Sequence, residues 1–316
     1  MAGALTEPDL AIEVAGLRLE HPVLNGSGTF DAIAAMRTFG ERLLADFPFA
    51  AFVSKTITLQ PRGGNHPPRL WETPAGLINS IGLPNKGLEG FLEHDLPDLA
   101  ALPVPLIVSV AGFGHDDFRR LVAEVAERPE VAALELNVSC PNVKSGCVMG
   151  SDPSETAALM DVVRPLTTKP LIVKLTPNVS DVAAVAGEAE RGGADALSLV
   201  NTLTGMALDS RSGAPWLGAG RGGVSGPAIR AVALAMTYDV ANRVEVPVIG
   251  MGGIECGQDA FDFIRAGATC VAVGTESFRD PAAGTRIREQ LRGLLAKRGI
   301  SSTRDAVGAT IEAAKN

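Results

Sequence analysis

The sequence predicts an α/β protein, a (β/α)8 TIM barrel with an N-terminal β-hairpin and insertions at its C-terminal face. Short runs of aliphatic and β-branched residues alternate with amphipathic segments of helical length, and eight such runs occur along the 316 residues. Most runs are almost continuously apolar, as is typical of parallel strands covered on both faces. Barrels of this length commonly form one domain, so residues 1–316 are expected to fold as one unit. A doubly wound sheet is the alternative.

The elements are expected in a regular order, beginning with a hairpin over residues 11–20. Strands are expected at 22–28, 50–56, 106–111, 133–139, 171–176, 196–201, 246–250 and 269–273. Amphipathic helices are expected at 116–126, 154–163, 182–191, 227–242 and 280–298, with a terminal helix after Gly299. Three polar, glycine-rich stretches, 59–86, 141–152 and 202–226, follow strands. In a barrel all three would gather at the C-terminal face, where barrel enzymes carry their chemistry.

Composition argues against several functional classes. The net charge is -8 and no run is rich in Lys or Arg, which disfavours nucleic-acid binding. Four cysteines without a CxxC pair, and four scattered histidines, argue against a disulfide framework, a metal site or an iron–sulfur site. The apolar runs are strand-sized, and the N-terminus does not resemble a signal peptide. A soluble, cytoplasmic protein that does not enter a membrane is therefore expected.

The glycine-rich ends of the last two expected strands predict a phosphate site. Gly252 and Gly253 follow the seventh strand, and Gly274 and Thr275 follow the eighth. Glycine lets backbone N–H groups of two neighbouring turns approach one anion. Barrels usually bind phosphate at this place, after the last two strands. Ordinary turn chemistry is the alternative interpretation of these glycines.

A thiol lies between two carboxamides where the fourth expected strand runs into a loop. Cys140 is flanked by Asn137 and Asn142 within six residues. A carboxamide both donates and accepts hydrogen bonds, so this arrangement suits a planar ring that carries C=O and N–H groups. A lone cysteine is often a small buried apolar residue, but the strand-end position beside Pro141 favours a catalytic role. Cys147, Cys256 and Cys270 lack that setting and are expected in packing or loop positions.

Polar residues also lie at the ends of other strands. A lysine in an apolar run is costly to bury unless it meets an anion or an electron-rich ring. Lysines that extend from strand ends to water are the alternative. Residues 79–85 contain turn residues that could present backbone N–H groups to a carboxylate. The polar strand-end residues are Ser27, Gly28, Lys55, Thr56, Lys174, Asn201 and Thr202.

Together these motifs carry a family resemblance. They read Lys55-Thr56, Asn79-Ser80-Ile81-Gly82-Leu83, Asn137-Val138-Ser139-Cys140-Pro141-Asn142, Asn201-Thr202, Gly252-Gly253 and Gly274-Thr275. In this combination the chain resembles the dihydroorotate dehydrogenases of pyrimidine biosynthesis, from residue 11 to about residue 280. Cysteine in the fourth-strand motif resembles the soluble class 1 enzymes, because the membrane-associated class 2 enzymes carry serine there. Residues 142–144, followed by Gly146 and Asp152-Pro153, look more like the NAD-linked class 1B than class 1A.

The resemblance implies that dihydroorotate is oxidised to orotate while FMN is reduced. It implies that Cys140 removes the C5 proton and that a hydride passes from C6 to the flavin N5. The substrate-binding residues that it implies are Lys55, Asn79, Ser80, Ile81, Gly82, Leu83, Asn137, Asn142, Asn201 and Thr202. The FMN-binding residues that it implies are Ser27, Lys55, Thr56, Ser109, Asn137, Lys174, Val200, Gly226, Gly252, Gly253, Gly274 and Thr275. Ser109 departs from the family pattern, which commonly has Asn, and a flavin hydrogen bond is expected to be shortened or lost there.

The resemblance also implies partners. Class 1B enzymes work with a separate subunit that carries FAD and a 2Fe-2S cluster, and this chain has neither a GxGxxG after a strand nor a cysteine cluster to bind them. A homodimer, or a heterotetramer with that subunit, is expected. The alternatives are a class 1A enzyme that reduces fumarate, a dihydropyrimidine dehydrogenase-like subunit, and a non-enzymatic flavin-binding module. Lys55 and the 79–83 loop favour a substrate with a carboxylate, which uracil lacks.

Overall fold

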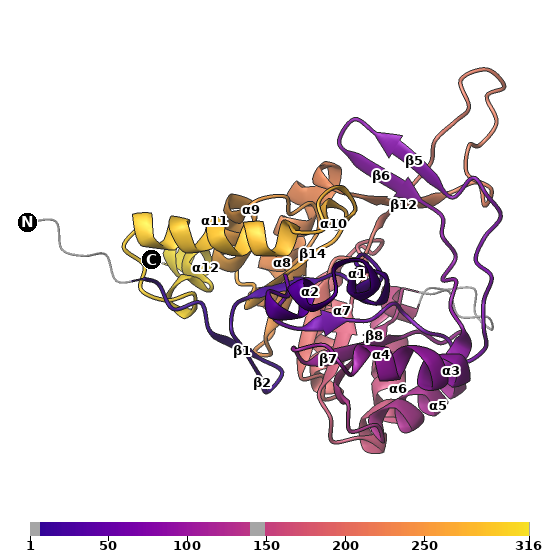
Figure 1. The fold of residues 1–316 in the computed structure, drawn as a ribbon, viewed down its shortest axis with the longest axis horizontal. Coiled ribbons are helices and arrows are strands. Elements are labelled where there is room, and N and C mark those ends of the chain that lie inside the picture. Colours follow the sequence, from indigo (N-terminus) through magenta and orange to yellow (C-terminus); the bar gives the residue numbers. More distant parts are fainter. Residues whose placement is uncertain (1–6, 140–148, 316) are drawn as a thin grey trace, which may run out of the picture.

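The structure is a computed structural model that describes residues 7–139 and 149–315. A parallel sheet of eight strands forms its centre, in the order β3-β14-β13-β10-β9-β8-β7-β4 (Figure 1). Each predicted run overlaps one of these strands, so the predicted α/β barrel is confirmed. The strands are β3 (Val23–Asn25), β4 (Phe52–Val53), β7 (Leu106–Val110), β8 (Val131–Asn137), β9 (Leu171–Lys174), β10 (Ala196–Leu199), β13 (Val248–Met251) and β14 (Cys270–Val273).

The seam between β3 and β4 is closed partly by a side chain. Ala50 N donates to Val23 O at 2.9 Å. One step further along, the Asn25 carboxamide donates to Val53 O and accepts from Val53 N, both at 2.8 Å. This buried side chain thus replaces the backbone pair that a longer strand would supply. The sheet closes into a cylinder although both strands at the seam are very short.

Alternate strand residues point into the cylinder and form a core separate from the helix-facing one. Ile107 and Ile172 belong to this inner cluster, together with the N-terminal hairpin residues Ile12 and Val14. The hairpin, β1 (Ile12–Val14) and β2 (Leu17–Leu19), is antiparallel as predicted. It packs against the early residues of the strands. The apolar half of the barrel interior is therefore covered by the hairpin, and the polar half lies toward the C-terminal ends of the strands.

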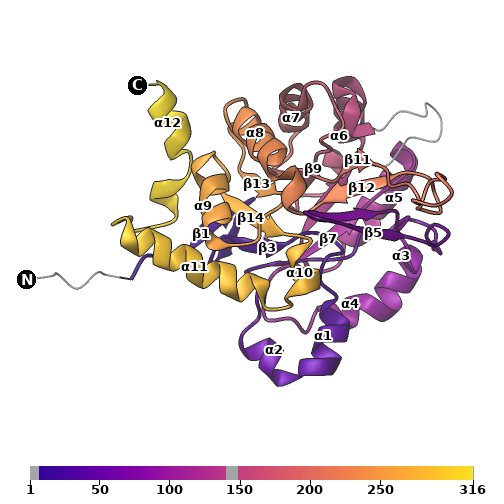
Figure 2. The same cartoon turned by 90° about the horizontal axis from the view of Figure 1, so that it is seen from above.

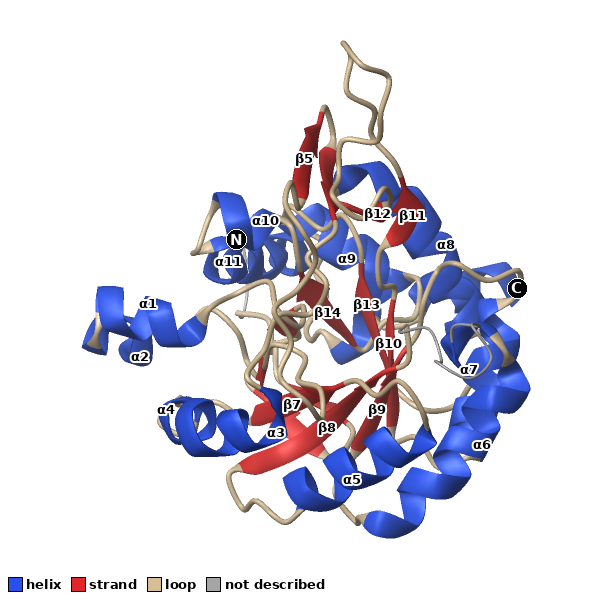
Figure 3. Ribbon diagram, turned by 90° about the vertical axis from the view of Figure 1, so that its right-hand side faces the viewer, coloured by secondary structure: helices blue, strands red, loops and turns tan. Residues whose placement is uncertain are grey.

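Helices surround the barrel strands in a ring (Figure 3). All five predicted helices are confirmed, as α5 (His115–Ala126), α6 (Pro153–Val163), α7 (Val182–Arg191), α8 (Arg230–Ala241) and α11 (Ala283–Lys297), and α12 (Ala309–Lys315) is the predicted terminal helix. The remaining α- and π-helices of the described ranges are α1 (Ala32–Phe39), α2 (Glu41–Ala45), α3 (Gly87–Gly90), the π-helical η1 (Phe91–Asp95), α4 (Leu96–Leu99), α9 (Gly257–Arg265) and α10 (Glu276–Arg279). α1 and α2 project from the ring (Figure 2). No helix in the described ranges is long and apolar enough to cross a membrane.

Two stretches that the sequence analysis treats as irregular instead form a second sheet. The strands β5 (Leu70–Thr73), β6 (Gly76–Asn79), β11 (Leu203–Gly205) and β12 (Gly222–Ser225) are antiparallel, in the order β11-β12-β6-β5. They project from the barrel (Figure 1). Three of these four strands contain glycine, which is rare in strands, so a search for strand patterns in the sequence does not find them. Glycine is needed here, because a Cβ at Gly222 would lie 2.4 Å from Asn79 O on the paired strand.

Candidate active site

Polar side chains from non-adjacent parts of the chain meet at the C-terminal ends of the barrel strands. Asn137 and Lys174 are the last residues of β8 and β9 and are paired in register. Thr56 follows β4, and its hydroxyl lies within 3.4 Å of Asn137 Nδ2. In a parallel barrel these ends share one face. The predicted meeting of residues 56, 137 and 174 is therefore present.

Two lysine ammonium groups lie at this face. Lys174 is buried, and its Nζ donates to Ser27 Oγ at 2.8 Å, which joins β9 to the end of β3. Lys55 passes directly over Gly28, where a Cβ would lie 2.9 Å from Lys55 Nζ. Much of the Lys55 side chain is open to solvent, yet desolvation of its ammonium lowers its pKa, and the positive charge of Lys174 lowers it further. Two cations at one site favour an anionic or electron-rich ligand.

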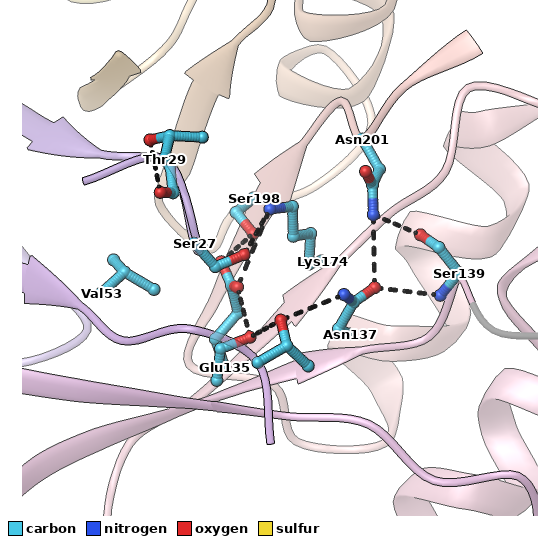
Figure 4. A network of polar contacts seen from close by, with 12 residues as sticks. Ser27, Thr29, Val53, Glu135, Asn137, Ser139, Lys174, Ser198 and Asn201 are labelled. Carbon is cyan, nitrogen blue, oxygen red and sulfur yellow. Dashed lines mark hydrogen bonds and ion pairs between the residues drawn. The ribbon is translucent and has the colours of Figure 1, made fainter. Parts of the chain in front are cut away.

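A buried carboxylate, Glu135, lies near Lys174 (Figure 4). It is 3% exposed, Ser109 Oγ donates to its Oε1 at 2.9 Å and Ser198 Oγ donates to its Oε2 at 3.1 Å. Lys174 Nζ lies 3.9 Å from Oε1. Glu135 is not among the site residues predicted from the sequence. It could have been identified because it is an acidic residue at an inward-facing position of a mostly apolar strand.

Two carboxamides adjoin this cluster. Asn201 Nδ2 donates to Asn137 Oδ1 at 3.3 Å and to Ser139 Oγ at 3.0 Å (Figure 4). Ser139 N also donates to Asn137 Oδ1, at 3.3 Å. Asn137 and Asn201, two of the predicted substrate-binding residues, therefore lie in contact. Cys140 and Asn142 lie outside the described residues, so their predicted roles stay predictions.

The 79–83 loop and residue 202 are connected to the same face through the outer sheet. Asn79 Nδ2 donates to Gly223 O at 3.2 Å, and a Cβ at Gly223 would lie 1.9 Å from Thr202 Oγ1. Thr202 N donates to the carboxamide of the neighbouring Asn201 at 2.8 Å. Within the loop, Gly82 and Leu83 both have a positive φ, 79° and 54°. The β6–β12 pairing therefore brings these two predicted substrate segments together.

The glycine-rich strand ends converge as predicted. Gly252 and Gly253 have φ values of 133° and 73°, and a Cβ at Gly253 would lie 2.8 Å from Gly226 O. Val200 N donates to Met251 O at 2.9 Å, which ties the end of β10 to β13. Thr275 Oγ1 donates at 2.9 Å to Ser225 Oγ, a residue that the sequence analysis missed. The site has the close backbone approach that a phosphate group requires.

An open hollow of about 1270 Å³ adjoins the site at Gly28 and Lys55. It extends between α1, η1 and α10, and Phe39 and Phe278 on its lining are 50% and 61% exposed. Of the other cysteines, Cys270 is the first residue of β14, at the opposite end of that strand from this face, and Cys256 is the N-cap residue of α9. Burial raises the pKa of the Cys270 thiol, so it stays protonated. Cys147 lies outside the described residues.

The fold and the site together define an enzyme of the α/β-barrel class, with its polar groups at the C-terminal face and glycine-rich turns after the last two strands. The family model described as dihydroorotate dehydrogenase matches residues 9–295. This chain therefore belongs to the dihydroorotate dehydrogenase family.

Relatives agree with this assignment over almost their whole length. The chain is 44% identical over 306 residues to "Dihydroorotate dehydrogenase B (NAD(+)), catalytic subunit" of Geotalea daltonii, covering 96% of this chain and 99% of that one. It is 46% identical over 307 residues to the protein of the same name from Trichlorobacter lovleyi, with the same coverage. A solved structure of the dihydroorotate dehydrogenase of Eimeria tenella with ferulenol superposes with a TM-score of 0.78 at 24% identity, covering 96% of this chain and 88% of that one. That likeness supports the fold alone.

Proposed function

We propose that this chain oxidises dihydroorotate to orotate with FMN as its bound cofactor, as the catalytic subunit of an NAD-linked enzyme of pyrimidine biosynthesis. The observation that carries the proposal is the meeting of Lys55, Lys174, Asn137 and Asn201 at one barrel face, beside the glycine-rich strand ends. Family membership and the names of the relatives support the reaction.

The residues at this face fit FMN. A phosphate would be held by Gly226, Gly252, Gly253, Gly274 and Thr275, and at Gly226 and Gly253 the backbones approach each other closely. The flavin ring would be held by Ser27, Lys55, Thr56, Asn137, Lys174 and Val200. Ser109 is fully buried and its hydroxyl contacts Thr56 and Glu135, so we expect it to influence the ring through those residues. When bound, FMN supplies the hydride acceptor.

The substrate would lie between the carboxamides and the 79–83 loop. Asn79, Asn137, Asn142 and Asn201 can donate to the ring carbonyls and accept from the ring N–H groups. Lys55, Thr202 and the backbone of residues 80–83 would bind the carboxylate. Cys140 is proposed to take the proton from C5 while a hydride leaves C6. A thiol is a workable base when it lies within hydrogen-bonding distance of that proton.

The experiment that tests this function is anaerobic mixing of the purified, FMN-loaded protein with dihydroorotate or with dihydrouracil. We expect dihydroorotate to bleach the flavin absorbance with release of orotate, and dihydrouracil to leave it unchanged, because only dihydroorotate offers a carboxylate to Lys55. Bleaching by dihydrouracil would favour a dihydropyrimidine dehydrogenase-like enzyme. A protein that binds FMN and responds to neither compound would be a flavin-binding module.

The same proposal covers assembly and location. We propose one FMN-binding domain over residues 1–316, a homodimer, and association with a subunit that carries FAD and a 2Fe-2S cluster. The words "catalytic subunit" in the names of the relatives support a partner chain. We place the enzyme in the cytoplasm.

A further inference from the structure

Glu135 is a charge buried at a place where burial is costly. Its side chain is 4% exposed, and it lies in the barrel interior above the apolar inner cluster. Transfer of a carboxylate out of water is unfavourable unless hydrogen bonds and an opposite charge compensate it. Two serine hydroxyls and the Lys174 ammonium supply that compensation, from β7, β10 and β9 respectively. Three barrel strands other than its own thus supply partners to this one buried side chain.

One of the contacts of Glu135 is its ion pair with Lys174. Lys174 is itself buried, and its Nζ donates a 2.8 Å hydrogen bond to Ser27 and lies 3.9 Å from Glu135. The ammonium, at the C-terminal end of β9, therefore lies near both the Ser27 hydroxyl and the Glu135 carboxylate (Figure 4). The negative charge of Glu135 reduces the positive potential that Lys174 presents to a ligand at the C-terminal face.

A second set of contacts is a chain of hydrogen bonds that leads from Asn137 through Thr56 and Ser109 to Glu135, and every donor in it donates toward Glu135. A carboxylate only accepts, so the single proton of the Ser109 hydroxyl is donated to Glu135. The 2.9 Å contact between Thr56 and Ser109 must then use the Thr56 proton. Thr56 in turn accepts from Asn137 Nδ2 at 3.4 Å. This leaves Asn137 Oδ1 as the acceptor for Asn201. The Ser139 N–H donates to the same Oδ1 at 3.3 Å, so the chain that begins at Glu135 and the Ser139 backbone together favour one orientation of the Asn137 carboxamide.

We propose that Glu135 is a positioning residue of the active site, which sets the positive potential of Lys174 at the flavin and orients the Asn137 carboxamide through Ser109 and Thr56. The inference rests on the proposed function, because it takes FMN to be the ligand above Lys174. Glu135 itself is expected to touch neither FMN nor substrate, since Ser109, Ser198 and Lys174 surround its carboxylate.

The test is the midpoint potential of bound FMN in Glu135→Gln, measured by anaerobic dye-equilibration titration. Reduction adds negative charge to the flavin, and removal of the Glu135 charge leaves Lys174 better able to stabilise it. At a fixed potential we expect the ratio of reduced to oxidised flavin to rise about tenfold. For a two-electron couple this corresponds to a midpoint potential about 30 mV higher. Orotate affinity, read from its spectral perturbation of oxidised FMN, should fall because Asn137 loses the support of the Ser109–Thr56 chain and keeps only that of Ser139 N and Asn201.

Two variants serve as controls. Ser198→Ala removes one hydrogen bond to the carboxylate without changing its charge, and we expect it to change the flavin ratio less than twofold. Glu135→Asp keeps the charge and should restore the ratio to within twofold of the wild type. A midpoint potential in Glu135→Gln equal to that of the wild type would overturn the inference, as would a shift of equal size in Ser198→Ala.

A second measurement applies if Glu135→Gln does not fold. In the reduced-minus-oxidised infrared difference spectrum of wild type labelled with ¹³C-glutamate, we expect an isotope-sensitive carboxylate signal that disappears in Glu135→Asp. Absence of that signal in the wild type would overturn the inference. Failure of the wild type to bind FMN, or to be reduced by dihydroorotate, would instead contradict the proposed function. The two failures are therefore distinguishable.

Discussion

At the scale of single residues, the site combines groups of opposite charge in adjacent layers. The two lysines lie at the open face, and the lowered pKa of Lys55 reflects desolvation first and the charge of Lys174 second. Glu135 lies one layer below, 3.9 Å from Lys174. A ligand that brings negative charge to the upper layer relieves the repulsion between the lysines. The geometry therefore favours binding of an anion or a reduced, electron-rich ring over binding of a cation.

Cys140 is the residue on which the proposed chemistry depends most directly, because its sulfur is the proposed base. We expect Cys140→Ser to slow flavin reduction by dihydroorotate at least about 100-fold, because a serine hydroxyl is a far poorer base at neutral pH. Orotate binding should be largely retained, since the carboxamides and Lys55 are unchanged. Stopped-flow measurement of flavin bleaching gives the rate, and a spectral titration gives the orotate affinity.

The matched control is Cys256→Ser, which makes the same change at the N-cap of α9. Serine is a good N-cap residue, so stability and rate should both be preserved. Reduction of Cys140→Ser at the wild-type rate would exclude Cys140 as the base.

Residue-level prediction from the sequence was good where several polar residues occur together and poor where one residue stands alone. The lysines, Asn137, Asn201 and the glycines belong to motifs at strand ends, and the structure brings them together. Glu135 and Ser225 are single polar residues inside strands. Their role depends on which strands are neighbours, and a sequence pattern does not contain that information.

At the scale of elements, the seam between β3 and β4 depends on one carboxamide. Asn25→Ala would leave both the N–H and the C=O of Val53 without their 2.8 Å partners inside the protein. Buried polar groups that lose a partner cost about 1–3 kcal/mol each, so we expect a loss of about 2–6 kcal/mol in the free energy of unfolding. Urea denaturation followed by circular dichroism measures it.

Asn242→Ala is the comparison for the seam variant. Asn242 is exposed at the end of α8, where its side chain donates to Tyr238 O at 2.9 Å. Removal of this surface hydrogen bond should cost less than about 0.5 kcal/mol. Equal denaturation midpoints for the two variants would show that the Asn25 carboxamide does not hold the seam.

The elements also show why part of the fold escaped prediction. The barrel strands are apolar runs that alternate with amphipathic helices, and this pattern predicted all eight. The strands of the outer sheet are three or four residues long, and β12 begins with two glycines. Such strands are stabilised by pairing with segments far away in the chain, as Asn79 pairs with Gly223. Local preference carries no signal for that pairing.

At the scale of the whole molecule, the proposal divides the work between two chains. We expect the chain purified alone to be reduced by dihydroorotate but to form no NADH. NADH formation should appear when the chain is co-expressed with a subunit that contributes FAD and iron, and the two should co-purify. Absorbance at the NADH maximum and an iron assay provide the measurements.

Two results would contradict this division. One is NADH formation by the chain alone. The other is rapid turnover with fumarate as the acceptor, which would favour the class 1A alternative.

The pairing of β14 with β3 has a consequence for how the protein is made. Ala272 lies beside Leu24 in this pair, so the last barrel strand in the sequence pairs with the first one. A ribosome must release almost the entire chain before that edge is covered. Until then, β3 offers an unpaired edge to any neighbouring nascent strand. During biosynthesis this protein therefore remains vulnerable to aggregation until its last barrel strand has emerged.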